Sequence, residues 1–278
     1  MTAWIQEWTP PRPEGTATVR VLCLPYAGGG AIRYRAWAAA MPPGAELHAV
    51  ELPGHGRRLP ESPAAGLTGI IEALTPLAAR PGPPLVLFGH SMGALLAHEL
   101  CRALLAYDVT PAALVLSGMS PAHLVDRSAQ RALAEDPDAL LHHVRELGAT
   151  PPEVLDTPAL RELVLRTMRA DLRLLASFPD ASPADPLPAG VPVTALSGQD
   201  DGRYPPHTVA AWAAFAERWE GTHILPGGHF FPWQDDTVPR LLASLAHTIA
   251  STARPASRPT VAASRPAVKE NPHDHRSR

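Results

Sequence analysis

The stretch 85–100 limits what this chain can fold into more than any other part of it. A short apolar run leads into Gly89-His90-Ser91-Met92-Gly93, and the residues that follow carry apolar side chains at helical spacing. A strand, a tight turn and a helix in this order give Gly-x-Ser-x-Gly the context of a nucleophile elbow, which exposes the serine hydroxyl at the end of a strand. We therefore expect Ser91 to act as a nucleophile. The alternative is an ordinary glycine-rich turn with a surface serine.

Strand-like and helix-like segments alternate along most of the remaining chain. Besides the strand before Ser91 and the helix after it, the apolar runs predict strands at 19–24, 46–52, 112–118, 191–198 and 222–226. Helical patterns lie between and after them, at 32–40, 66–79, 206–219 and 238–249. This alternation predicts an α/β fold with a mostly parallel central sheet flanked by helices. Functional loops are then expected at the carboxyl ends of the strands.

The segment 119–185 follows a different pattern. It contains helical segments at about 128–134, 137–147 and 157–177 and no convincing strand. Since this is too long for a simple crossover, we predict a helical lid inserted over the site. Residues 1–250 are then one domain. The remainder, 251–278, is a mixture of Pro, Ser, Arg and His with little apolar content, and is predicted to be a disordered tail.

Composition narrows the class of protein. The 278 residues are 45% hydrophobic, and the formal net charge of −3 argues against nucleic acid as a partner. Cys23 and Cys101 are predicted to be buried and unpaired. The first nine residues do not look like a secretion signal, and no apolar run approaches the roughly 20 residues that span a bilayer. We expect a cytoplasmic monomer without membrane contact.

A serine hydroxyl needs a base, and the base needs a carboxylate that orients it. The chain order nucleophile, acid, histidine is that of the α/β-hydrolase fold. His229 follows the last predicted strand and is the expected base. The acid is Asp200 or Asp201, which are adjacent after the strand that ends at Gly198. In hydrolases of this kind the acid commonly lies three residues past that glycine, which favours Asp201 and leaves Asp200 as second choice.

The remaining histidines are assigned no role in catalysis. His55, which precedes the serine and lies between two glycines, is expected to be structural or at the rim of the site. His142 and His143 are adjacent on one predicted helix, so they point in different directions and do not form a metal pair. No metal site is predicted. Structural roles are also expected for further histidines: His90, His98 and His223.

The glycine-rich loop at 25–31 follows the strand at 19–24. It lacks the Gly-Lys-Ser/Thr ending of a P-loop and the Gly-x-Gly-x-x-Gly spacing of a dinucleotide site. It does fit one half of an oxyanion hole, where a backbone N–H must approach the substrate without a side chain in the way.

Several motifs, taken together and in order, resemble one family. They are Leu24-Pro25-Tyr26-Ala27-Gly28-Gly29-Gly30, Leu52-Pro53-Gly54, Gly89-His90-Ser91-Met92-Gly93-Ala94, the run 147–155, Arg169-Ala170-Asp171 and the run 226–231. Over about 19–245 the chain resembles the type II thioesterases, discrete editing α/β-hydrolases that accompany modular polyketide synthases and nonribosomal peptide synthetases. It departs from them at Asp201-Gly202-Arg203-Tyr204, where relatives often have Asp-Pro and an aliphatic residue. That departure leaves the choice between the two aspartates open.

The resemblance implies hydrolysis of stalled or aberrant acyl groups on the 4′-phosphopantetheine arm of an acyl or peptidyl carrier protein. In that reaction the backbone N–H groups of Ala27 and Met92 bind the oxyanion, and no cofactor of the enzyme's own is needed. Two other functions remain open. One is a general carboxylesterase or lipase-like serine hydrolase, since the elbow alone does not distinguish an ester from a thioester. The other is a non-catalytic interaction protein with a hydrolase fold.

Overall fold

One sheet runs through the computed structural model of the chain, which describes residues 4–9, 17–180 and 182–253. Its strand order is β1-β3-β2-β4-β5-β6-β7. Only the edge strand β1 is antiparallel to its neighbour, and every other pair is parallel. The strands are β1 (Ile5–Glu7), β2 (Val19–Leu24), β3 (Ala45–Val50), β4 (Leu85–His90), β5 (Ala113–Ser117), β6 (Val193–Gly198) and β7 (Trp219–Leu225).

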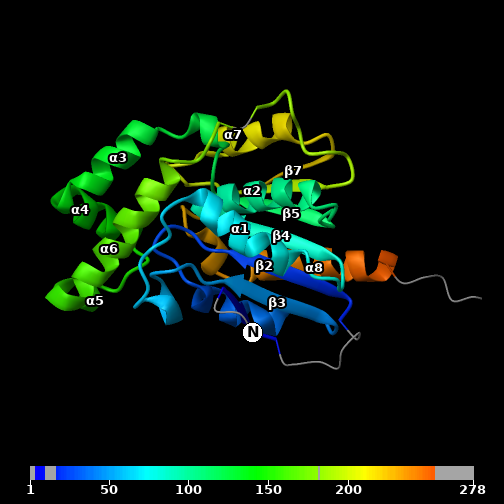
Figure 1. Cartoon of the computed structure of the whole chain (residues 1–278), viewed down its shortest axis with the longest axis horizontal. Helices are drawn as coiled ribbons and strands as arrows, with labels where there is room; N and C mark the ends of the chain where they lie inside the picture. The colour runs from blue at the N-terminus through cyan, green and yellow to red at the C-terminus, as the bar shows by residue number, and fades with distance from the viewer. Residues whose placement is uncertain (1–3, 10–16, 181, 254–278) are drawn as a thin grey trace, which may run out of the picture.

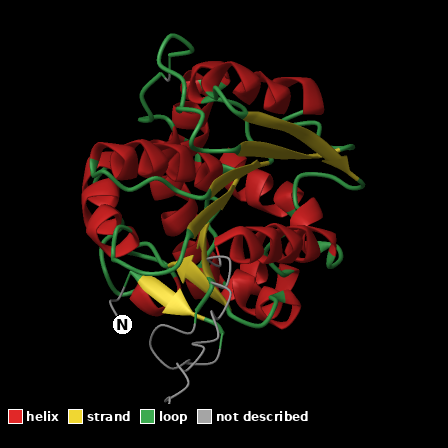
Figure 2. Ribbon diagram, turned by 90° about the vertical axis from the view of Figure 1, so that its right-hand side faces the viewer, coloured by secondary structure: helices red, strands yellow, loops and turns green. Residues whose placement is uncertain are grey.

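The central strands are apolar on both faces, and each face has its own core. Along β2, Leu22 and Leu24 join one cluster of buried side chains, while Val21 and Cys23 join the other. Successive side chains of a strand point to opposite faces, so a continuous apolar run needs a covering layer on each side. The two layers of helices are the consequence of that pattern (Figure 2).

One layer contains α1 (Leu67–Ala78), α2 (Met92–Ala106), α7 (Pro206–Val209) and the 3₁₀ segment η4 (Ala210–Phe215). The other contains η1 (Ala31–Ala40), η5 (Phe231–Trp233) and α8 (Thr237–Ala253). Figure 1 shows α1 and α2 in front of the sheet and α8 behind it. Two further short 3₁₀ segments lie in loops, η2 (Gly56–Arg58) and η3 (Ala122–Leu124). This arrangement is the α/β-hydrolase fold that the sequence predicts.

The lid is a separate group of helices at one end of the sheet (Figure 1). It consists of α3 (Arg127–Glu135), α4 (Pro137–Leu147), α5 (Pro152–Asp156) and α6 (Pro158–Leu175). Asp126 and Asp136 cap the first two helices by accepting hydrogen bonds from backbone N–H groups of the first turn. Apolar side chains of these helices form a third, smaller core that also touches Ala27. The helical insertion therefore packs directly on the loop at 25–31.

Among the boundaries that differ from the sequence-based expectation, two concern the helices after β6. The predicted helix at 206–219 is confirmed only as far as Phe215, because α7 is followed by the 3₁₀ segment η4, which ends there, and Trp219 is already the first residue of β7. Backbone hydrogen bonds from Leu187 to Phe215 and from Glu217 to Leu187 hold this stretch extended and prevent a continuous helix. At the other boundary α8 continues to Ala253, three residues beyond the predicted end of the domain.

The remainder of the predicted tail, 254–278, lies outside the described residues. Cys23 and Cys101 are both buried and unpaired, as predicted. Within the described ranges, no helix is long and apolar enough to cross a membrane.

Candidate active site

Ser91 lies in a strained turn between β4 and α2. Its backbone has φ +53° and ψ −125°, a region that non-glycine residues rarely occupy. The turn is held because the Ser91 N–H donates to the carbonyl of Ser117 on β5, at 2.8 Å. A Cβ at Gly89 would collide with the Gly93 carbonyl, and one at Gly93 with the Leu24 carbonyl. Both glycines are therefore required by close backbone packing, and the hydroxyl of Ser91 is directed to the end of the sheet.

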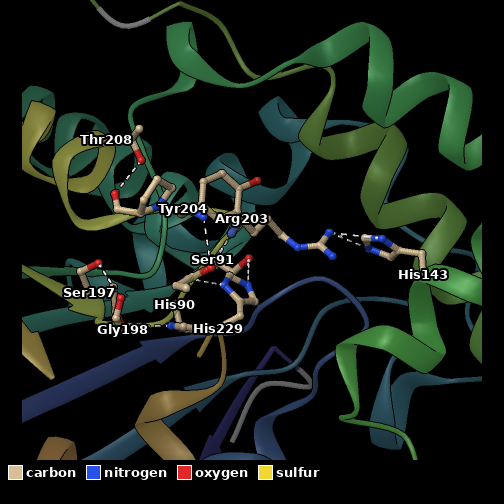
Figure 3. Close-up of polar contacts among 12 residues, drawn as sticks. His90, Ser91, His143, Ser197, Gly198, Arg203, Tyr204, Thr208 and His229 are labelled. Atoms are coloured by element: carbon tan, nitrogen blue, oxygen red, sulfur yellow. Dashed lines mark hydrogen bonds and ion pairs between the residues drawn. The ribbon is translucent and has the colours of Figure 1, made fainter. Parts of the chain in front are cut away.

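His229 connects this hydroxyl to a buried carboxylate (Figure 3). Its Nε2 lies 3.1 Å from Ser91 Oγ and its Nδ1 lies 2.8 Å from Asp201 Oδ2. Burial alone would raise the pKa of Asp201, but the hydrogen bond and charge of His229 outweigh it and lower that pKa, aided by the N–H groups of Tyr204 and Arg203. The ionised carboxylate only accepts hydrogen bonds, so Nδ1 carries the proton whenever the ring is in its neutral form. Nε2 is left as the acceptor that faces Ser91.

The loops that carry Asp201 and His229 follow neighbouring strands. Gly198 at the end of β6 pairs with Leu225 at the end of β7. A Cβ on Gly198 would lie 2.6 Å from the carbonyls of both Gly227 and Gly228. Only glycine therefore permits the two loops to approach closely enough for the aspartate to reach the imidazole.

The structure places Asp201, and not Asp200, against His229. The Asp201 N–H donates to the Gly198 carbonyl, and the Asp201 side chain is turned into the protein, where it is 1% exposed. Asp200 is exposed, and its side chain makes no hydrogen bond to a described residue. The second-choice acid is thus not brought to the site.

Within the part of the chain that the structure describes, the other histidines make no hydrogen bond to the Ser91 hydroxyl, although the ring of His90 lies 5.0 Å from that of His229, centroid to centroid. His90 is fully buried below the elbow, with Nδ1 3.0 Å from Ser117 Oγ, and burial lowers its pKa well below the usual range. His98 contacts Glu99 on α2 and packs against Trp212. His223 lies on β7. Within the described ranges, no group of three or more potential ligand side chains forms a metal site.

The two backbone N–H groups predicted to form an oxyanion hole belong to Met92, which follows Ser91, and to Ala27, which lines the same cavity as Ser91. Met92 is the first residue of α2, so its N–H has no acceptor within the helix. Ala27 lies in a turn closed by the hydrogen bond from Gly29 N–H to the Tyr26 carbonyl, at 2.8 Å. No described residue accepts a hydrogen bond from the Ala27 N–H, and Ala27 lines the same cavity as Ser91.

Side chains of the lid form part of the wall of that cavity. The cavity is narrow, with a volume of about 30 Å³, and the lid contributes Met168, Leu172 and Leu175 of α6 to its wall. Phe230 and Tyr26 form the opposite wall, packed edge to face with ring centroids 4.9 Å apart. Apolar side chains therefore share the cavity around Ser91 with polar ones, which besides His229 include Gln130, His143, Arg203 and Tyr204.

A contact between the lid and the aspartate loop is not apparent from the sequence. Arg203 Nη1 lies 3.2 Å from Nδ1 of His143 on α4, and both side chains line the cavity (Figure 3). Burial, together with the charge of Arg203, lowers the pKa of His143 to about 4. The sequence predicts only an ordinary helix residue at position 143, because its contact with Arg203 depends on how α4 packs in the folded protein.

Comparison with known proteins identifies the family of this chain. The family described as "Thioesterase domain" matches residues 19–249, which include Ser91, Asp201 and His229. The chain is 30% identical over 226 residues to the gramicidin S biosynthesis protein GrsT of Aneurinibacillus migulanus, covering 80% of this chain and 86% of GrsT. It is 36% identical over 230 residues to the AMB antimetabolite synthetase AmbE of Pseudomonas aeruginosa; the match covers 81% of this chain and 10% of AmbE.

A solved structure gives the same result. The type II thioesterase BorB from the borrelidin biosynthetic cluster superposes with a TM-score of 0.74 at 30% identity. The match covers 87% of this chain and 97% of BorB. The likeness therefore extends over nearly the whole of that protein, sheet and helices together.

Proposed function

This chain belongs to the thioesterase family, and we propose that it hydrolyses acyl groups from the phosphopantetheine arm of acyl or peptidyl carrier proteins, by way of an acyl-enzyme on Ser91. The observation that carries the proposal is the position of His229, with one ring nitrogen 3.1 Å from Ser91 Oγ and the other 2.8 Å from Asp201 Oδ2. The relatives support the substrate class, because GrsT is named for gramicidin S biosynthesis and BorB is a type II thioesterase of a biosynthetic cluster.

In the first half-reaction, Ser91 Oγ attacks the thioester carbonyl while His229 Nε2 takes the hydroxyl proton. Asp201 stabilises the imidazolium that results. The carbonyl oxygen becomes an oxyanion that accepts hydrogen bonds from the N–H groups of Ala27 and Met92, and each such donor contributes roughly 10²–10³ in rate. The carbon–sulfur bond then breaks. A thiol with a pKa of about 8.5 leaves readily, and the proton on His229 passes to the sulfur.

In the second half-reaction, His229 takes a proton from water, and the oxygen of that water attacks the acyl-enzyme. The same two N–H groups stabilise the second oxyanion. When it collapses, Ser91 leaves and recovers its proton from His229, which releases the free acid and restores the site. Ser91, His229, water and the leaving thiol account for every proton transferred in this scheme, so the proposal includes no cofactor.

The proposal is tested by comparing kcat/KM for one acyl group on three carriers: a carrier protein, free pantetheine and p-nitrophenol. We expect the carrier-bound thioester to be preferred at least tenfold over the pantetheine thioester, and Ser91→Ala to abolish turnover of both. A preference for the p-nitrophenyl ester would instead favour a general carboxylesterase. If a fluorophosphonate failed to label Ser91 and no substrate turned over, the chain would be a non-catalytic member of the fold.

A further inference from the structure

A buried aspartate of the lid contacts the loop that carries Ala27. Asp171 lies on α6, and its side chain is 4% exposed. Its Oδ2 accepts a hydrogen bond from the Gly28 N–H at 2.7 Å and lies 2.8 Å from Nε2 of His55. Positions 28, 55 and 171 belong to three separate segments of the chain. One carboxylate oxygen therefore joins the lid, the loop at 25–31 and the loop after β3.

The contacts of His55 favour the protonated form of its ring. Its Nδ1 lies 3.1 Å from the Pro53 carbonyl and its Nε2 faces the Asp171 carboxylate, so both ring nitrogens face acceptors. Both contacts are satisfied when the ring carries two protons. Burial by itself would lower the pKa of His55, but the charge and hydrogen bond of Asp171 outweigh it and raise that pKa. His55 and Asp171 thus form a hydrogen-bonded pair shielded from water, and because their hydrogen bonds within the described residues are made only to each other and to nearby backbone, loss of either partner is costly.

The turn at Tyr26–Gly29 explains why the Gly28 N–H matters. In a β-turn closed between its first and fourth residues, the N–H groups of the two central residues are not used by the turn. Here those residues are Ala27 and Gly28, and Gly28 has φ +75°, as the third position of a type II turn requires. Asp171 binds the Gly28 N–H, so the Ala27 N–H is the one that remains for a substrate oxygen.

The far end of the same loop is held independently of the lid. The Ala31 N–H donates to Oε1 of Glu51 at 3.1 Å, and Glu51 is 2% exposed. This carboxylate lies at the end of β3 and belongs to the domain beneath the lid. At the turn itself, by contrast, the acceptor comes from the lid. A Cβ on Gly28 would also lie 2.8 Å from the terminal methyl of Met168, so α6 packs tightly against the turn.

We propose that Asp171 is a positioning residue that holds the turn so that the Ala27 N–H faces the oxyanion, and that it does so only when α6 is seated on the domain. The lid then has two roles, because the same helix that walls the acyl cavity also completes the oxyanion hole. A displaced α6 would leave the turn without its acceptor and the hole without a fixed donor. This inference rests on the proposed function of Ala27.

The test compares Asp171→Ala and Asp171→Asn with a matched lid control, Asp180→Asn, whose exposed side chain pairs with Arg127. For each variant, kcat and KM are measured for an acyl-pantetheine thioester. The concentration of active sites is taken from the amount of fluorophosphonate bound when labelling is complete, and kcat is expressed per active site. We expect Asp171→Ala to lower kcat 10- to 100-fold with KM changed less than threefold. Loss of a whole donor costs roughly 10²–10³, and here the donor is displaced rather than removed.

Asp171→Asn keeps an oxygen that can accept from Gly28 and should retain more activity than Asp171→Ala. Hydrogen exchange at the Gly28 amide should accelerate in Asp171→Ala and be unchanged in Asp180→Asn. If Asp171→Ala does not fold, the same comparison is made between Asp171→Asn and the wild type, with at least a threefold loss of kcat expected.

The inference is overturned if the folded Asp171 variants keep the wild-type kcat per labelled site. Any loss of total activity would then only follow a loss of labelled sites, as for a merely structural residue. The rate of fluorophosphonate labelling separates this inference from the proposed function, because labelling needs Ser91 and the oxyanion hole but no thioester. Suppose that the wild type hydrolyses no thioester, but that a fluorophosphonate labels Ser91 more slowly in Asp171→Ala than in the wild type. That result would contradict the proposed function and still support the role of Asp171 in the oxyanion hole.

Discussion

At the scale of single residues, Asp200 and Asp201 are adjacent in the chain, but only the Asp201 side chain reaches His229. Both carboxylates follow β6, but the Asp200 N–H donates to Gly227 while the Asp201 N–H turns back to Gly198. These two bonds direct one side chain to solvent and the other to His229. Residue type and spacing narrow the acid to this pair. The directions of the two side chains depend on backbone hydrogen bonds, one of which reaches a loop 27 residues further along the chain.

The two aspartates therefore give a matched test of which one orients His229. Asp201→Asn presents an amide N–H₂ or oxygen to Nδ1 and disturbs the tautomer that leaves Nε2 free to accept from Ser91. We expect kcat to fall on the order of 10⁴-fold, as for the corresponding change in a serine protease. Asp200→Asn should stay within twofold of the wild type. Equal losses in the two variants, measured on the same thioester with intact circular dichroism, would contradict the assignment of Asp201.

At the scale of elements, α4 of the lid carries a pH-sensitive contact. His143 is neutral near pH 7, because burial and the charge of Arg203 hold its pKa at about 4, below the ordinary value of 6.5. Unfolding frees the ring from both influences. Between pH 6.5 and 4 the unfolded chain therefore binds more protons at this position than the folded chain, and His143 weakens the fold as the pH falls.

We expect His143→Gln to remove this penalty. Relative to the wild type, the free energy of unfolding of the variant should rise progressively as the pH falls from 6.5 to 4, and the difference should be constant above pH 7. Urea titrations at a series of pH values measure it. His142, exposed on the same helix and paired with Glu146, supplies the control variant His142→Gln, which should not reproduce the trend. A pH-independent difference for His143→Gln would show that the ring is not held neutral by its surroundings.

The elements also show where prediction from sequence succeeds and where it stops. The strands next to Ser91 are evident because each is buried on both faces and so must be apolar throughout. The end of the stretch 206–219 is mispredicted because its apolar spacing fits a helix, while backbone bonds between Leu187 and the 215–217 region impose an extended end. The conformation there is determined by a contact with a residue almost 30 positions earlier in the chain, and not by the local apolar pattern.

At the scale of the whole molecule, the site is a product of long-range contacts. The sequence names Ser91 and His229 because a motif and a chain order apply to them, and these residues lie 138 positions apart. It does not reveal that Asp171 contacts Gly28 and His55, or that Arg203 contacts His143. Those pairs arise from how the lid packs on the sheet, and neither has a fixed spacing that a reader of the sequence would recognise.

The core on the sheet face that α8 covers leads to a prediction about the end of the chain. Val238, Leu242 and Ala246 of α8 are buried against the face of the sheet that carries Val21 and Cys23. A chain ending at residue 253 keeps all three, together with every group of the candidate site. We therefore expect it to unfold at the wild-type temperature and to retain the wild-type kcat.

A chain ending at residue 241 is the matched comparison, because it loses Leu242 and Ala246 from the same core. Removing one buried leucine side chain alone costs about 2–5 kcal/mol, which is a large part of the stability of a typical domain. We expect this shorter chain to be unfolded or strongly destabilised at 25 °C, as measured by circular dichroism and thermal unfolding. A drop in melting temperature or kcat on shortening to residue 253 would mean that residues beyond α8 contribute to the fold or the site, and that the two sheet faces and the lid are not sufficient for either.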